Sequence, residues 1–141
     1  PGMGVITDKG VIGQVKSVSN NFATVISLLH PKLMVSATVK NKGTLSSVQW
    51  GSNSFLEADL KFIPRHIPLT VGDTIVTSGF NAVFPSNILL GIVSEVSLDA
   101  QDPFYNAKID LSVDFTSLGF VYVIKNKAKA ELDSLIEVSD F

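Results

Sequence analysis

The sequence predicts an all-β protein with two small β-barrel-like subdomains, followed by a short C-terminal helix or tail. Three observations support this fold class: strand-like alternation, closely spaced turn residues and an internal repeat. Apolar and polar residues alternate over 23–28, 35–39 and 107–113, as in strands with one buried face. Turn-forming clusters at 8–10 and 41–43 separate such runs. Many short strands at this spacing are typical of a barrel or sandwich.

The elements follow one another with short connections. Two strands flank the turn at 8–10, and a third strand is expected over 23–28. The alternating run at 35–39 is followed by the turn at 41–43, where glycine supplies a positive φ, which predicts a tight hairpin. A further strand is expected over 55–62, before the second copy of the repeat begins.

The internal repeat relates residues 2–19 to residues 72–97. The first strand of the unit matches at an offset of 70 positions and the second strand at 78. An insertion at 80–87 accounts for the difference. Gly13 and Gly91 occupy equivalent places inside strands, where glycine marks a bulge or a close backbone approach. We interpret the repeat as two copies of one strand–turn–strand unit, the second carrying a loop insertion.

The repeat divides the chain into a β domain over 1–125 and a tail over 126–141. The region of about 33–70 is expected to form a second subdomain inserted between the two copies. In the tail, apolar residues fall at helical spacing over 126–137, which predicts a short helix, with a disordered tail as the alternative. Because the chain starts at Pro1 and not at Met, we expect it to be a fragment of a larger protein.

Composition excludes several classes of site. The 141 residues include no cysteine, which excludes a disulfide framework, a thiolate metal site and a Cys nucleophile. Eleven basic residues, ten of them Lys, stand against 13 acidic residues, so the Arg-rich basic excess of nucleic-acid-binding proteins is missing. Charged residues make up only 17% of the chain, below the usual value of about 25%. We therefore expect no nucleic acid, no metal and no cofactor, but a surface that a partner covers.

One catalytic alternative remains open from the residues themselves. Ser78 precedes Gly79 and follows a predicted strand, Asp73 lies nearby, and His30 or His66 would have to act as the base. Together these residues would make the protein a chymotrypsin-like serine hydrolase. The Gly-x-Ser-x-Gly elbow of many hydrolases is missing, so a turn is the preferred interpretation of the Ser-Gly pair. Neither histidine has a close second ligand for a metal.

The sequence gives little support for two other kinds of site, an acid–base pair of carboxylates and a platform of aromatic rings. Glu57 and Asp59 lie two positions apart on an expected strand, so they share one solvated face and do not look like an acid–base pair. An oligonucleotide- or sugar-binding barrel would need stacked aromatic rings with basic neighbours. Trp50, Tyr105 and Tyr122 are scattered along the chain instead.

The second copy of the repeat carries a family resemblance. It reads VGDTIVTSG over 71–79, FP at 84–85 and ILLGIV over 88–93, which resembles the signature of the MreC family, the rod shape-determining proteins. The start of the chain, with GM at 2–3 and GVIGQV over 10–15, resembles the first part of the same family pattern. The motif residues are Gly10, Gly13, Gly72, Asp73, Thr77, Ser78, Gly79, Phe84, Pro85 and Gly91.

The sequence departs from the family pattern in the insertion. Asn81, Ala82 and Asn87 stand where the family usually has glycine. Asparagine tolerates the left-handed backbone conformation better than other residues with a side chain, so the turn can survive at 81 and 87. Ala82 implies a different detailed loop conformation. We interpret the motif residues as architecture and not as a catalytic site.

The resemblance implies a non-enzymatic scaffold that organises cell-wall elongation and controls cell shape. Its family members have one inner-membrane helix, a coiled coil that forms a homodimer and an extracytoplasmic β domain. This chain would be that domain, placed in the periplasm or extracytoplasmic space. The implied partners are a penicillin-binding transpeptidase, the membrane proteins MreD and RodZ, and the MreB cytoskeleton. The implied fold is two small barrels that resemble chymotrypsin-like proteases without their catalytic residues.

The insertion is also the expected interaction surface. It is unusually apolar for a loop, and no charged residue lies between Gly79 and Gly91. We expect Phe80 and Val83 to face outward and contact a partner or a second copy of the chain, because a few apolar anchors carry most of the affinity in protein interfaces. The Phe84-Pro85 pair is expected to pack inward and hold the loop.

Overall fold

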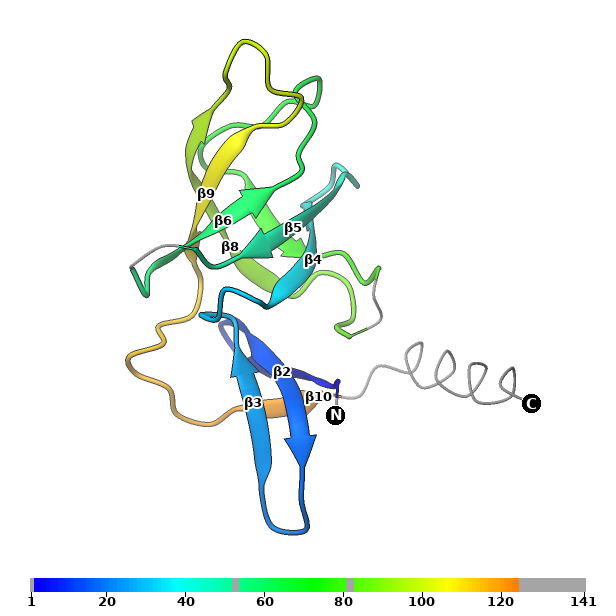
Figure 1. Ribbon diagram of the computed structural model, residues 1–141, viewed down its shortest axis with the longest axis vertical. Coiled ribbons are helices and arrows are strands. Elements are labelled where there is room, and N and C mark those ends of the chain that lie inside the picture. Colours follow the sequence, from blue (N-terminus) through cyan, green and yellow to red (C-terminus); the bar gives the residue numbers. More distant parts are fainter. Residues whose placement is uncertain (1, 52–53, 81–82, 125–141) are drawn as a thin grey trace, which may run out of the picture.

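Two β units make up the protein, one beyond the other along its long axis (Figure 1). The structure is a computed structural model that describes residues 2–51, 54–80 and 83–124. Its strands are β1 (Gly4–Thr7), β2 (Gly10–Val18), β3 (Ala23–Ser27), β4 (Met34–Val39), β5 (Leu45–Gln49), β6 (Glu57–Lys61), β7 (Thr74–Thr77), β8 (Leu89–Ser97), β9 (Asn106–Leu111) and β10 (Tyr122–Ile124).

The first unit is a four-stranded sheet and the second is a closed barrel. The sheet has the strand order β10-β1-β2-β3, and the barrel closes in the order β4-β5-β6-β9-β8-β7. All neighbouring strands are antiparallel. The described ranges contain strands and turns and no helix, so the predicted all-β class with two barrel-like units is confirmed. The helix expected over 126–137 lies outside the described residues.

The region of about 33–70 does not form a separate body between the repeat copies. Its strands β4, β5 and β6 join β7, β8 and β9 of the second copy in the one closed barrel. The hairpin between β4 and β5 turns through Asn41 at φ 70° and Gly43 at φ 67°. Both residue types tolerate this left-handed backbone, which explains why the turn residues could be read from the sequence.

The two copies of the repeat have the same strand register. Val5 of β1 pairs with Gly13 of β2, and Ile75 of β7 pairs with Gly91 of β8. A bulge follows each of these pairs directly, between Val5 and Ile6 in the sheet and at the corresponding place in the barrel. The structural repeat therefore reproduces the offsets of the sequence repeat, including the local irregularity.

The structure extends the repeat to further strands. Beyond β2, Val15 pairs with Val25 of β3 and a bulge follows; beyond β8, Val93 pairs with Ile109 of β9 and again a bulge follows. On the other side, β10 pairs with β1 as β4 pairs with β7. The four-stranded sheet thus corresponds to four of the six barrel strands. Strands that would correspond to β5 and β6 are not among the described residues of the sheet.

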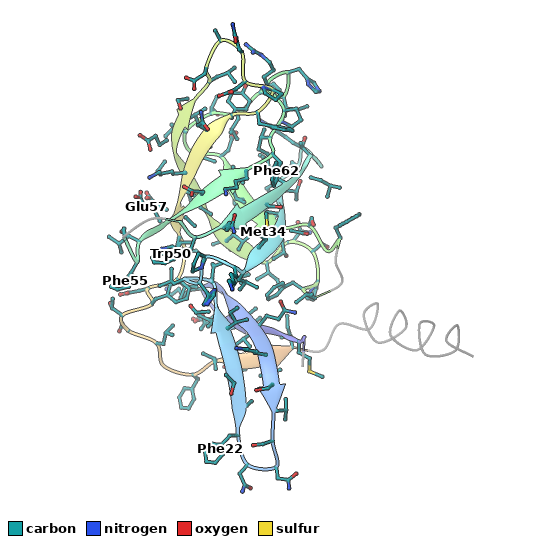
Figure 2. All side chains as sticks on the ribbon, viewed as in Figure 1. Phe22, Met34, Trp50, Phe55, Glu57 and Phe62 are labelled. Carbon is teal, nitrogen blue, oxygen red and sulfur yellow. The ribbon has the colours of Figure 1, made fainter. Side chains whose placement is uncertain are left out.

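This correspondence explains the apolar surface of the sheet. Ile109 in the barrel is fully buried, whereas Val25 at the equivalent place on β3 is 39% exposed. The β2–β3 hairpin projects away from the barrel and carries the exposed Phe22 near its tip (Figure 2). Because the described residues of the sheet supply no strands equivalent to β5 and β6, its outer strands leave in contact with solvent side chains whose equivalents in the barrel are buried.

The core runs from the barrel into one face of the sheet. Val11 and Leu28 of the sheet unit belong to the same buried cluster as Leu90 and Phe84 of the barrel unit. The opposite face of the sheet has a smaller cluster that includes Ile12, covered by the segment that connects β9 to β10. No helix of the described residues has the length and apolarity that a membrane crossing requires.

Phe62 departs from the strand alternation that precedes it. Ala58 and Leu60 point into the barrel, so simple alternation places Phe62 inside as well. Instead β6 ends at Lys61, and Phe62 adopts φ 71°, which leaves its ring 47% exposed and buries Ile63. The strand predicted over 55–62 is therefore shorter than expected, and a left-handed residue changes the direction of the side chains at its end.

Candidate functional site

The insertion between β7 and β8 starts from a fully buried threonine. Thr77 is 1% exposed, and its hydroxyl donates a hydrogen bond to the Pro85 carbonyl (2.6 Å) and accepts one from the Ile88 N–H (2.9 Å). The Thr77 carbonyl accepts a hydrogen bond from the Asn87 N–H (2.9 Å). The returning arm of the loop is therefore bound to the last residue of β7.

The phenylalanines of the insertion point in opposite directions. Phe84 is 6% exposed and joins the main buried cluster, whereas Phe80 is 68% exposed. The expectation that Pro85 packs inward with Phe84 is wrong: the Pro85 ring is exposed, because Thr77 holds only its carbonyl. Val83 is half-buried and packs against the barrel core, so it faces outward less than we expected. Phe80 is thus the main apolar side chain that the loop presents to solvent.

A small pocket lies beside this loop, at the junction of the two units. It is lined by residues of β2, β4, β7 and the insertion, namely Gln14, Met34, Val35, Ser36, Thr77, Gly79, Phe80, Val83 and Phe84. Met34, at the start of β4, is 43% exposed and lies at the end of the barrel nearer the sheet (Figure 2). We call Met34, Phe80 and Val83 the junction surface. Its side chains are apolar, which suits contact with another protein and not chemistry on a polar substrate.

Met34 and Gln14 were not singled out from the sequence. Met34 lies 46 positions before Phe80 in the sequence and Gln14 lies 66 before it, and their position beside Phe80 depends on how the sheet and barrel pack. The only available signal was Met34 itself, a large apolar residue at the start of a strand. The hydroxyl of Thr77 was part of the family motif, but its two loop contacts depend on the conformation of the insertion.

The residues of the hydrolase alternative have separate local partners. The Ser78 hydroxyl accepts the Phe80 N–H (3.1 Å), and His30 Nδ1 accepts the Lys32 N–H (3.1 Å). His66 is exposed in the connection between β6 and β7. No hydrogen bond among the described residues joins Ser78 to either histidine. The structure does not bring these residues together as a triad.

Asp73 is engaged in a turn and not in a catalytic arrangement. Its carboxylate accepts hydrogen bonds from the Thr70 N–H (3.0 Å) and the Thr70 hydroxyl (3.2 Å), and lies 3.4 Å from Lys42 Nζ. Burial by itself would raise the pKa of Asp73. The Thr70 hydrogen bonds and the positive charge of Lys42 outweigh it, so the pKa is lowered from its usual 3.8. The neighbouring Gly72 has φ 101°, which the turn requires.

The other glycines of the motif allow close backbone contacts. A side chain on Gly13 would collide with the carbonyl oxygen of Ile26, and one on Gly91 with that of Asp110. Gly10 packs against the Leu89 carbonyl at the boundary between the units. Glycine at these places is therefore a packing requirement, in agreement with its interpretation as architecture.

The remaining candidates for chemistry are dispersed. No group of three or more His, Asp or Glu side chains able to hold a metal occurs within 2–51, 54–80 and 83–124. The Glu57 carboxylate lies 3.8 Å from Lys108 Nζ on the outer face of the barrel. The Trp50 indole N–H donates to the Ser54 carbonyl, and the Tyr105 hydroxyl donates to the Arg65 carbonyl. The aromatic side chains named from the sequence therefore do not form one stacking platform.

Comparison with known proteins identifies the architecture. Residues 1–125 match the family model for rod shape-determining protein MreC, barrel core. The chain is 31% identical over 140 residues to the cell shape-determining protein MreC of Listeria monocytogenes, covering 92% of this chain and 45% of that protein. The corresponding protein of Escherichia coli is 31% identical over 100 residues, or 71% of this chain and 27% of that protein. The chain thus spans less than half the length of these curated relatives.

Solved structures of MreC proteins have the same architecture as this chain. MreC from Pseudomonas aeruginosa has a TM-score of 0.80 at 22% identity, covering 88% of this chain and 79% of that one. MreC from Listeria monocytogenes has a TM-score of 0.79 at 31% identity, covering 89% and 61%. The complex between penicillin-binding protein PBP2 and MreC from Helicobacter pylori matches with a TM-score of 0.72 at 19% identity, covering 89% and 78%. Since the family model covers residues 1–125, and thus every described residue, the chain belongs to the MreC family of rod shape-determining proteins.

Proposed function

We propose that this chain is the partner-binding β domain of a non-enzymatic scaffold that organises cell-wall elongation and so controls cell shape. The observation that carries the proposal is the junction surface, where Phe80 is 68% exposed on a loop anchored by buried Thr77 and Phe84. Aromatic side chains beside other apolar groups commonly serve as interface anchors. The cell-shape names of the curated relatives support the cellular role.

The partner that we propose for this surface is a penicillin-binding transpeptidase. A relative with the same fold, at 19% identity, is described in complex with penicillin-binding protein PBP2. The apolar side chains of the junction surface, and their position beside the sheet residue Gln14, suit a protein ligand.

Further proposals concern the whole protein. We infer an inner-membrane anchor with this domain in the periplasm, a homodimer through a coiled coil, and contacts with MreD, RodZ and the MreB complex. The family membership supports them. Protease added to intact spheroplasts should digest the domain if the topology is right, and protection of the domain would refute it.

The catalytic alternative can be separated from the scaffold by a chemical probe. We propose that the protein has no hydrolase activity, a view supported by the local partners of Ser78 and His30. A fluorophosphonate probe should leave the protein unlabelled. Labelling that disappears in Ser78→Ala would establish a reactive serine and contradict the scaffold-only proposal.

Binding to the transpeptidase tests the main proposal. Isothermal titration of the chain with the extracytoplasmic part of the elongation transpeptidase from the same cell should show saturable binding. Phe80→Ala should weaken it about 10- to 30-fold, since loss of an interface anchor costs about 2 kcal/mol. Met34→Ala should act in the same direction.

Val71→Ala is the matched control, because Val71 is 65% exposed but lies beyond the opposite end of β7. It should bind as the unchanged protein does. Absence of saturable binding by the unchanged chain would refute the proposed function. Normal binding by both Phe80→Ala and Met34→Ala would refute the junction surface.

A further inference from the structure

The hydroxyl of Thr77 makes contacts that a strand residue does not normally make. Backbone hydrogen bonds connect Thr77 with both Ile88 and Asn87 across the base of the insertion. The side-chain oxygen adds two more, donating to the Pro85 carbonyl and accepting from the Ile88 N–H. Thr77 is therefore bound to three of the four residues from Pro85 to Ile88, all before β8 begins.

A hydroxyl at this buried position would destabilise the fold if it were unpaired, but it can bind backbone groups of the loop. The two residues before it, Ile75 and Val76, are apolar and buried, and valine would match threonine in shape. An unpaired hydroxyl or backbone group in such a place would be destabilising. The Thr77 hydroxyl is fully paired, and it satisfies two backbone groups of the loop that have no strand partner.

The other arm of the insertion is held to β4, and it contacts the returning arm, because a Cβ on Gly79 would stand 3.4 Å from the backbone nitrogen and the Cβ of Ser86. The Ser78 N–H donates to the Ser36 carbonyl of β4 (3.1 Å), and the Ser78 hydroxyl accepts the Phe80 N–H. Gly79 turns the chain at φ 77°. Phe80 therefore follows immediately after residues held to β4, while the returning arm is held to Thr77. The two arms together define where the exposed Phe80 ring stands.

We propose that Thr77 is a positioning residue for partner binding, whose hydroxyl holds the insertion in the conformation that presents Phe80 to the transpeptidase. This inference rests on the proposed function of the junction surface. Thr77 itself is too buried to contact the partner. Its effect comes from preorganisation, because a loop already ordered in its bound conformation loses less entropy on association.

Substitution of the hydroxyl provides the test. Thr77→Val keeps the shape but removes the hydroxyl, and should weaken transpeptidase binding about tenfold. Thr77→Ser keeps the hydroxyl and should bind within about twofold of the unchanged protein. In Thr77→Val, amide hydrogen exchange at Ile88 and Asn87 should become faster, since the hydroxyl no longer fixes this arm.

A double substitution separates positioning from general destabilisation. If Thr77 acts by placing the Phe80 ring, then Thr77→Val should not weaken binding further when Phe80→Ala is already present. If Thr77→Val lowers the melting temperature but binds with unchanged Kd, Thr77 is merely structural and the inference is overturned. If Thr77→Val does not fold, Thr77→Cys is used, because its thiol is only a weak hydrogen-bonding group. Unchanged Kd in that variant also overturns the inference.

The outcomes distinguish this inference from the proposed function. Unchanged binding in Phe80→Ala refutes the junction surface itself, whatever Thr77→Val does. Weakened binding in Phe80→Ala together with normal binding in Thr77→Val refutes only the role of Thr77.

Discussion

The phenyl ring of Phe84 lies directly against the α-carbon of Gly4, at the junction of the two units. A methyl group on Gly4 would stand 2.5 Å from Cδ1 and from Cε1 of that ring. Gly4 opens β1 of the sheet, and Phe84 belongs to the barrel insertion. The same glycine is also close to the Val83 carbonyl, 3.1 Å from the position of such a methyl group. The contact between sheet and insertion therefore depends on the absence of a side chain at Gly4.

Substitution at Gly4 should destabilise the protein through Phe84. Gly4→Ala is expected to lower the free energy of unfolding by about 1–3 kcal/mol, because the buried ring cannot move aside without disturbing its neighbours. Phe84→Ala alone should cost about 3–5 kcal/mol through the cavity it leaves. In Phe84→Ala the added methyl group has space, so Gly4→Ala should then cost much less. Urea unfolding of the two single variants and the double variant measures this coupling. Additive losses would contradict a direct contact.

Gly13 and Gly91, which occupy equivalent positions in the two copies of the repeat, should respond alike to substitution. At each of them a new Cβ would collide with a backbone carbonyl of the neighbouring strand, which cannot rotate away. We expect Gly13→Ala and Gly91→Ala each to lower the free energy of unfolding by about 3 kcal/mol or to prevent folding. Gly119→Ala is the control, since a Cβ there meets nothing within 4 Å. Thermal unfolding should show it close to the unchanged protein, and an equal loss in all three would refute the steric explanation.

The repeat was the part of the fold that the sequence predicted best. Equivalent glycines such as Gly13 and Gly91 can be recognised from the sequence alone, because the close backbone contacts at these positions require glycine. The third repeated strand was not recognised. β3 and β9 share register and a bulge, but their residues share only an alternating pattern, which many strands have. Closure of the barrel likewise depends on pairing between β6 and β9, which are distant in the chain.

The candidate site was predictable only where one segment determines it. The outward Phe80 and inward Phe84 follow from a short apolar loop that must anchor itself. Met34 and Gln14 reach the same pocket from other elements, so no local pattern could place them there. Phe62 shows the same limit for local rules, because its left-handed backbone interrupts the alternation of the strand and leaves its ring exposed.

Asn87 should tolerate glycine but not alanine. It has φ 69° in the insertion, a conformation that costs a residue with an ordinary side chain about 1–2 kcal/mol. We therefore expect Asn87→Ala to lower the free energy of unfolding by about 1 kcal/mol. Asn87→Gly should leave it nearly unchanged, since relief of strain offsets the greater freedom of glycine when unfolded. Chemical unfolding compares the two, and equal losses would mean that the backbone conformation is not the cause.

The carboxylate of Asp73 should make stability depend on pH in the acid range. Burial alone would raise its pKa, but the Thr70 hydrogen bonds and Lys42 hold the pKa below the usual 3.8 in the folded protein. A group with a lowered folded pKa contributes its full stability above the unfolded pKa, and loses it as the pH falls through the folded value.

At pH 7, Asp73→Asn should therefore be less stable than the unchanged protein by about 1 kcal/mol. As the pH falls from 3.8 towards and through the lower folded pKa, the two should converge, because protonation removes the charge that distinguishes Asp73 from asparagine. Asp8→Asn, on an exposed turn, changes the net charge equally and serves as the control. Urea unfolding at pH 7 and pH 3 measures the difference, and a gap for Asp73→Asn that stays constant between these pH values would show that the ionised carboxylate is not responsible.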